Sequence, residues 1–253
     1  MKRLLRILGL ILLVLLLLNA AVIAYFITSR GPKERAQTAL QTTGQVEVTS
    51  GEWQIFAPRN TTPTTGLIFY PGTFVNPKAY AEPAYTMAAA GYLVVVVPMP
   101  LGMAFLAPNR AATVQAAFPD IEKWVIGGHS QGGSYAIRYA FANPDEVDGL
   151  ILWAGRPLGN DDLSGRNLPV LSINGSLDPR RSPEILAEIE ARLPADAKHI
   201  NIDGGTHEYF GDYAGELDEE VIEKAITQDK QTEIIIEESV DFLATVSAMS
   251  DGR

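Results

Sequence analysis

One short motif constrains the fold of this chain more than any other feature. Residues 128–132 read Gly-His-Ser-Gln-Gly, with the serine at Ser130. The apolar run 124–128 predicts a strand directly before the serine, and residues 132–142 predict a helix directly after it. A very tight strand-to-helix turn needs glycine two positions before and after the serine, because a side chain there would meet the opposite arm of the turn. The motif therefore predicts a serine nucleophile raised above a sheet.

Apolar runs and helical stretches alternate along most of the chain. The run Val94–Val97 is β-branched, which is typical of a central parallel strand. Alternation with short connections predicts a mostly parallel sheet with helices on both faces. Further strands are expected at 48–58, 66–72, 91–100, 147–155, 168–175 and 199–205, and further helices at 77–91, 110–118, 182–193, 219–226 and 233–248.

The N-terminal segment differs from the remainder. Residues 7–28 carry no charge and follow a basic start, and such a run is long enough to cross a bilayer as a helix. We expect a signal-anchor helix over 1–28, a linker over 29–46 and one domain over 47–253. A cleaved signal peptide ending at Ala24 is the alternative.

The orientation of this segment is predicted less directly, because basic residues lie on both sides of it. A basic start before a long apolar run favours the N-terminus inside. We therefore expect a single-pass protein of the cell membrane with its domain on the extracytoplasmic side.

Composition excludes several classes of function. The formal net charge is −10, and the first 35 residues are basic, so the body is still more acidic and unsuited to nucleic acids. The chain has no cysteine, which rules out disulfides and thiolate chemistry. Its three histidines lack the spacing of a zinc motif. We expect neither a metal nor a cofactor.

A serine nucleophile needs a base, and the base needs an acid to orient it. His207 follows the last expected strand, at the carboxyl end where parallel sheets carry their sites. His199 begins that strand, and His129 adjoins the serine but points elsewhere. Asp178 follows the preceding expected strand and is the favoured acid, whereas Asp203, inside the last strand, is a weaker candidate.

Two backbone amides should stabilise the oxyanion of the reaction. One belongs to Gln131, directly after the nucleophile, and the other to the loop after the strand 66–72. In that loop we favour the amide of Thr73, with Phe74 as the alternative.

Several segments of the chain resemble a known family. The segments GGHSQGG, GSLDP and GGTHEYFG resemble the α/β-hydrolase superfamily. The segments YPGTFVNPKAY and VVVPMPLGMAFLAPNRA narrow the resemblance to its bacterial "fold-5" proteins, distant relatives of dienelactone hydrolases and small esterases. The resemblance covers about 47–248 and implies an α/β-hydrolase fold with a Ser130–Asp178–His207 triad. It implies hydrolase activity without a defined substrate, and Pro71-Gly72 departs from the His-Gly that lipases and esterases often carry.

Together these features predict a membrane-anchored serine hydrolase that cleaves a small carboxylic ester through an acyl-enzyme. A peptidase or acyltransferase could use the same triad, and a non-catalytic binding protein could use the same fold. Residues 156–167 form only a short loop where many hydrolases insert a lid, so we expect a shallow site. Apolar residues of 98–108 either line an acyl pocket or pack under their loop. The natural substrate and the oligomeric state are left open.

Overall fold

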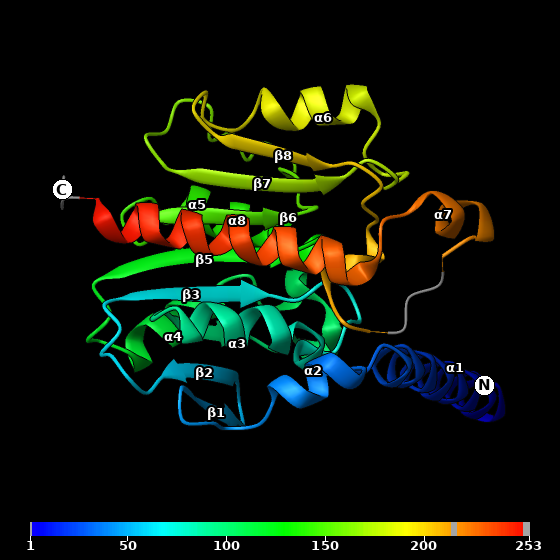
Figure 1. Cartoon of the computed structure of the whole chain (residues 1–253). Coiled ribbons are helices and arrows are strands. Elements are labelled where there is room, and N and C mark those ends of the chain that lie inside the picture. The colour runs from blue at the N-terminus through cyan, green and yellow to red at the C-terminus, as the bar shows by residue number, and fades with distance from the viewer. Residues whose placement is uncertain (1, 214–216, 250–253) are drawn as a thin grey trace.

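A computed structural model describes residues 2–213 and 217–249. Its centre is one eight-stranded sheet with the order β1-β2-β4-β3-β5-β6-β7-β8, seen edge to edge in Figure 1. The strands are β1 (Val46–Ser50), β2 (Gln54–Pro58), β3 (Thr65–Tyr70), β4 (Leu93–Val96), β5 (Lys123–His129), β6 (Gly149–Trp153), β7 (Val170–Gly175) and β8 (Lys198–Ile202).

The sheet is parallel from β4 to β8 and antiparallel at the edge formed by β1 and β2. The prediction of a single strand over 48–58 is wrong. The chain turns back near Gly51, whose amide bonds to the carbonyl of Trp53, and the two halves pair as a hairpin. The mostly parallel α/β-hydrolase sheet that the sequence predicts is otherwise confirmed.

Successive residues of each central strand enter two different cores. In β3, Leu67 and Phe69 pack on one face of the sheet, and Ile68 and Tyr70 pack on the other. The first face is covered by α2 (Glu34–Ala39), α3 (Ala81–Ala89) and α8 (Gln228–Ala248), and the second by α4 (Arg110–Ala117), α5 (Gln131–Ala142) and α6 (Pro183–Glu190). Both faces are buried, which explains the continuous apolar runs in the sequence.

Two helix boundaries differ from the sequence prediction. The segment expected as one helix over 77–91 is a short 3-10 turn, η1 (Pro77–Tyr80), followed by α3, and Pro83 is tolerated in the first turn of α3. The last helix begins at Gln228, because the Thr227 side chain accepts a hydrogen bond from the amide of Lys230 and caps it. A small helix, α7 (Glu219–Lys224), precedes it.

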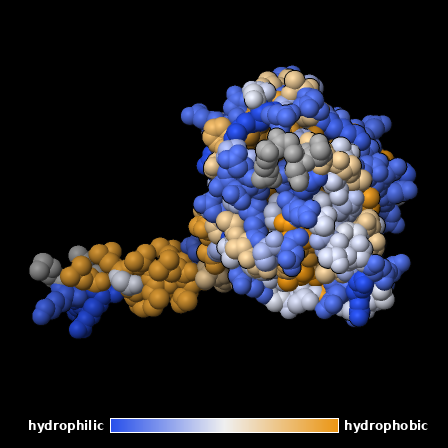
Figure 2. Space-filling model, turned by 90° about the vertical axis from the view of Figure 1, so that its left-hand side faces the viewer, coloured by the Kyte–Doolittle hydropathy of each residue, from blue (hydrophilic) through white to orange (hydrophobic). Residues whose placement is uncertain are grey.

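The first helix, α1 (Lys2–Ser29), lies outside the domain. Its window Leu5–Val22 has a mean hydropathy of 2.6 and none of it is buried. Figure 2 shows α1 as an apolar rod projecting from a largely hydrophilic body. The expected apolar N-terminal helix is present and is a candidate membrane span.

The segment between α1 and β1 is packed on the domain. Ala36 in α2 is fully buried, and its amide donates to Asp212 Oδ2 at 2.8 Å. The amide of Lys33 donates to the carbonyl of Asp212, and the amide of Asn76 donates to the carbonyl of Arg30. Because these partners follow β8 and β3, α1 leaves the domain beside the carboxyl edge of the sheet.

No lid is inserted in the described part of the chain between β6 and β7. Residues 154–169 contain neither a helix nor a strand. The described chain therefore carries no lid after β6, which leaves room for the site described next.

Candidate active site

Ser130 occupies the turn between β5 and α5. Its backbone has φ 54° and ψ −121°, a conformation that is rare for a residue with a side chain. The amide of Ser130 donates to the carbonyl of Trp153 in β6 at 2.8 Å, which ties the turn to the neighbouring strand. The serine stands at the N-terminus of α5, where helix amides favour developing negative charge.

The two motif glycines are required by close backbone contact. A Cβ atom on Gly132 would lie 2.0 Å from the carbonyl oxygen of Tyr70 and 2.4 Å from that of Pro71. A Cβ atom on Gly128 would lie 2.5 Å from the backbone of Gly132. The strand-to-helix turn expected from the sequence is therefore present, with the crowding that explains its glycines.

Asp178 and His207 meet at the carboxyl ends of β7 and β8. His207 Nδ1 lies 2.6 Å from Asp178 Oδ2, and both residues are buried. Asp178 Oδ1 accepts a hydrogen bond from the amide of Arg180 at 2.9 Å. Each carboxylate oxygen thus has a partner, and a carboxylate that only accepts requires the His207 Nδ1 atom to carry the proton.

The surroundings favour the charged form of Asp178. Burial by itself would raise the pKa of this carboxyl. The hydrogen bond and charge of His207, the Arg180 amide and the nearby Arg181 guanidinium outweigh burial and lower the pKa to about 2. Asp178 is therefore ionised at neutral pH and can stabilise a positive charge on His207.

Ser130 and His207 line the same hollow, which has a volume of ≈ 520 Å³. Gln131 also contributes to its wall. The structure thus brings the predicted nucleophile and the predicted base to one cavity, with the predicted acid bonded to the base.

The hydrogen bonds of the backbone amides in the loop after β3 distinguish the two oxyanion candidates. The Phe74 amide donates to the carbonyl of Gly102 at 2.9 Å, so it is already used inside the loop. Within the described part of the chain, the amides of Thr73 and Gln131 have no hydrogen-bond partner. The geometry therefore favours Thr73 over Phe74 as the second donor.

A buried relay beneath the serine is a feature that sequence reasoning missed. The Gly72 amide donates to Tyr80 Oη at 3.0 Å, and Tyr80 Oη lies 2.9 Å from His129 Nδ1. The Tyr80 hydroxyl therefore contacts both the Gly72 amide and the His129 ring. The His129 ring stacks on Phe210 and lies 4.7 Å from the ring of His207.

His129 is uncharged within this relay. Burial, and then the charge of His207, lower the pKa of His129 well below its usual range. The relay links the loop after β3 to the strand under the nucleophile and lies against the ring of His207. The sequence signals were a histidine inside the motif and a tyrosine in NPKAY, but only the tertiary structure pairs them.

The remaining sequence candidates lie away from this contact. His199 is exposed near the amino end of β8, and Asp203 is exposed just after that strand. The acid that contacts His207 in the structure is Asp178, not Asp203.

The apolar residues of the loop over 98–108 divide between the core and the surface. As far as the structure describes it, the lining of the Ser130 hollow includes none of these residues. Met99 is 8% exposed and packs in the core, whereas Leu101 is 56% exposed and Phe105 and Leu106 are each 45% exposed. The loop is held beside the nucleophile turn because the Ala104 amide donates to Gln131 Oε1.

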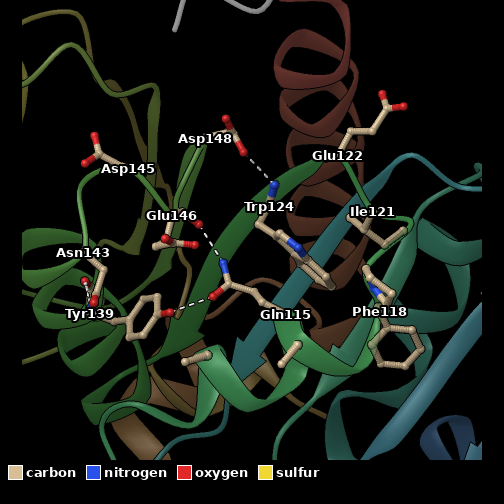
Figure 3. Close-up of a pocket in the computed structure, with 13 residues that line it drawn as sticks. Gln115, Phe118, Ile121, Glu122, Trp124, Tyr139, Asn143, Asp145, Glu146 and Asp148 are labelled. Atoms are coloured by element: carbon tan, nitrogen blue, oxygen red, sulfur yellow. Dashed lines mark hydrogen bonds between the residues drawn. The ribbon is translucent and has the colours of Figure 1, made fainter.

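A different hollow, of ≈ 580 Å³, lies at the end of the sheet where the parallel strands begin (Figure 3). It surrounds the start of β5, where the Trp124 amide donates to Asp148 Oδ2. Gln115 in α4 spans it by bonding both Tyr139 Oη and the carbonyl of Glu146. This hollow is remote from the carboxyl ends of the strands and holds none of the predicted site residues. The described residues contain no cluster of histidines and carboxylates suited to a metal ion.

Residues 66–233 match the model of the "Alpha/beta hydrolase family", and this match covers more than half of the chain. The chain belongs to the alpha/beta hydrolase family. Membership confirms the expected family and supports a hydrolase. No curated protein matches the sequence.

Solved structures share the fold. A predicted CIB-like hydrolase from Thermoplasma acidophilum superposes with a TM-score of 0.54 and 16% identity, over 78% of this chain and 98% of that chain. A structure described with LipS and LipT, two metagenome-derived lipolytic enzymes, superposes with a TM-score of 0.53 and 14% identity, over 72% and 94%. At this identity the likeness supports the fold alone.

Proposed function

We propose that this protein is a membrane-anchored serine hydrolase that cleaves carboxylic esters through an acyl-enzyme intermediate. The observation that carries the proposal is the hollow shared by Ser130 and His207, with Asp178 hydrogen-bonded to His207. A serine in a strained turn, a histidine on the same cavity and a buried ionised aspartate are the components of nucleophilic acyl transfer.

In the proposed reaction, His207 acts first as a base and then as an acid in each half-reaction. With its Nδ1 proton held by Asp178, neutral His207 has an unprotonated Nε2 that takes the proton of Ser130. The serine oxygen attacks the ester carbonyl, and the amides of Gln131 and Thr73 stabilise the oxyanion. His207 returns the proton to the leaving alcohol. In the second half-reaction His207 takes a proton from water, the resulting hydroxide attacks the acyl-enzyme carbonyl, and His207 returns the proton to the Ser130 oxygen as the acid is released.

The site is open, and this favours substrates of modest size. Its hollow of ≈ 520 Å³ has no lid above it in the described chain. We therefore propose a small acyl compound as the substrate, with rates that fall as the acyl chain grows beyond the hollow.

The proposed location is the cell membrane, with α1 as a single-pass anchor and the domain on the extracytoplasmic side. Support comes from the length, apolar character and complete exposure of Leu5–Val22. Retention of the full-length chain in membranes after alkaline carbonate washing is expected. Digestion of the domain by protease added to intact cells is the expected sign of its orientation, and protection of the domain would reverse that orientation.

The first test of activity is labelling of the full-length protein in mild detergent with a fluorophosphonate probe. We expect rapid labelling of the wild type and none of Ser130→Ala. His207→Ala should lower both labelling and p-nitrophenyl ester hydrolysis by about a thousandfold or more. If folded wild-type protein neither labels nor hydrolyses esters, the hydrolase proposal is wrong and a binding role on the same fold takes its place.

A further inference from the structure

Three arginines surround the nucleophile in a chain that is acidic overall. Arg156, Arg180 and Arg181 all line the hollow that contains Ser130, and no aspartate or glutamate is among its described lining residues. The whole chain has 20 basic and 30 acidic side chains, so this concentration of positive charge runs against the composition. The proposed hydrolase function does not itself need a cationic pocket.

Arg181 is a fixed cation in the wall. It is 8% exposed and donates to Asn174 Oδ1, to the carbonyl of Arg180 and to the carbonyl of Ala154. These acceptors are neutral, so they hold the guanidinium without cancelling its charge. Ala154 adopts a positive φ of 48°, and this turn presents its carbonyl to Arg181.

Arg180 contacts two acidic side chains, one inside the site and one beside it. Its Nη1 atom lies 3.4 Å from Asp178 Oδ1 and 3.9 Å from Glu208 Oε1. Asp178 and Glu208 are the negative charges next to Arg180, and Glu188 lines a smaller neighbouring hollow that Arg156 also lines. Arg181 bonds only neutral acceptors, so one arginine of the three has a side chain with no bonded partner among the described residues.

That arginine is Arg156. Its amide donates to Ser134 Oγ at 3.2 Å, which fixes its backbone beside α5 close to Ser130. The side chain of Arg156 is exposed and has no hydrogen-bond or ion-pair partner among the described residues. It stands where the Ser130 hollow adjoins a second hollow of ≈ 240 Å³, and Leu158 and Ile185 are common to both.

We propose that the ester substrate carries an anionic group, a carboxylate or a phosphate, which Arg156 binds while the ester carbonyl lies at Ser130. This inference rests on the proposed hydrolase function and names its substrate class. A guanidinium recognises both anions by paired hydrogen bonds. Leu158 and Ile185 supply apolar contact for a short carbon chain between the anion and the ester.

The kinetic test uses full-length protein in detergent and two esters of similar length, mono-p-nitrophenyl glutarate and p-nitrophenyl valerate. We expect the wild type to prefer the anionic ester, and Arg156→Gln to reduce this preference by about tenfold to a hundredfold, mainly through KM. Arg156→Lys should restore part of it, and added salt should weaken it. Arg59→Gln, which removes an exposed arginine remote from the hollow, is the matched control and should change nothing.

A second arm identifies the source of the anion. Lysophosphatidic acid in mixed micelles offers a phosphate on a lipid ester, whereas the glutarate ester offers a soluble carboxylate. Arg156-dependent hydrolysis of the first alone would assign a lipid phosphate, and of the second alone a soluble acid. Equal efficiency on neutral and anionic esters, or an equal loss on both in Arg156→Gln, would overturn the proposal.

A binding measurement separates this inference from the hydrolase proposal. Calorimetry with Ser130→Ala and monomethyl glutarate should detect binding that Arg156→Gln abolishes. If the wild type fails to label and to hydrolyse esters but this binding persists, the catalytic proposal fails and the anion site stands. If esters are cleaved and no Arg156-dependent binding or preference is found, the anion site fails alone.

Discussion

Tyr80 Oη lies 2.9 Å from His129 Nδ1, and this contact joins the loop after β3 to the strand that carries the nucleophile. The same hydroxyl accepts the Gly72 amide, so one side chain orients the backbone directly before Thr73. His129 stays neutral because burial and the neighbouring His207 lower its pKa, so the contact persists across neutral pH.

Replacing Tyr80 by phenylalanine is therefore expected to affect both stability and catalysis. The change leaves the Gly72 amide and His129 Nδ1 without a partner in a buried place, which should cost about 1–3 kcal/mol in the free energy of unfolding. A looser Thr73 amide should also lower kcat for p-nitrophenyl esters. Urea unfolding followed by tryptophan fluorescence, together with steady-state kinetics, measures the two effects.

Tyr85→Phe provides the control for this substitution. Tyr85 Oη bonds to Thr43 Oγ1 in an exposed position, so its loss removes the same hydroxyl without touching the site. Equal effects of the two substitutions would contradict the positioning role of Tyr80.

Asp178→Asn is expected to preserve the fold and lower ester hydrolysis by about a thousandfold to ten-thousandfold. The new amide can donate its N–H to His207 Nδ1. His207 then carries its proton on Nε2, which cannot accept the proton of Ser130. The amide also has no charge to stabilise the imidazolium. Asp203→Asn neutralises the exposed alternative acid and should leave kcat/KM unchanged. A large loss in Asp203→Asn with little loss in Asp178→Asn would reverse the assignment of the acid.

The lowered pKa of Asp178 also predicts a pH dependence of stability. A carboxyl whose pKa is about 2 in the folded state and about 3.9 when unfolded stabilises the fold above the unfolded value, by about 2 kcal/mol. This contribution should disappear as the pH falls from about 5 through about 2. Urea unfolding of wild type and Asp178→Asn at several pH values measures it.

The expected pattern is a difference between the two proteins that shrinks on acidification. Asp203→Asn, whose carboxyl is exposed, should differ from the wild type by a small and nearly constant amount over the same range. A constant difference for Asp178→Asn as well would mean that its charge does not stabilise the folded state.

Gly132→Ala is expected to disable the turn. The new Cβ atom would lie 2.0 Å from the carbonyl oxygen of Tyr70, so the backbone of β3 or α5 must shift. We expect a loss of fluorophosphonate labelling and a loss of stability of about 1–3 kcal/mol, which is typical of overpacking. Gly165→Ala is the control, because its new methyl group has nothing within 4 Å. If Gly132→Ala is labelled as well as this control, the turn is not crowded as described.

Much of this fold could be predicted from local sequence patterns. Apolar runs such as Val94–Val97 follow from the burial of both faces of a parallel sheet, and the motif around Ser130 requires a turn in which only glycine fits at its two ends. The hairpin near Gly51 was missed because residues 48–58 look like one continuous strand, and nothing in that run shows that the chain reverses its direction. The start of α8 was missed because a polar first turn lacks the apolar periodicity of a helix.

The sequence by itself determined most of the strands and helices, the apolar N-terminal helix and the residue types available for acyl transfer, since these depend on local periodicity and composition. Only the tertiary structure decided which side chains meet. Asp178 reaches His207 because β7 and β8 end side by side, Tyr80 reaches His129 across the sheet edge, and Arg156 faces the hollow of Ser130. These contacts join residues distant in the chain, and they are set by strand order and packing, which local sequence does not encode.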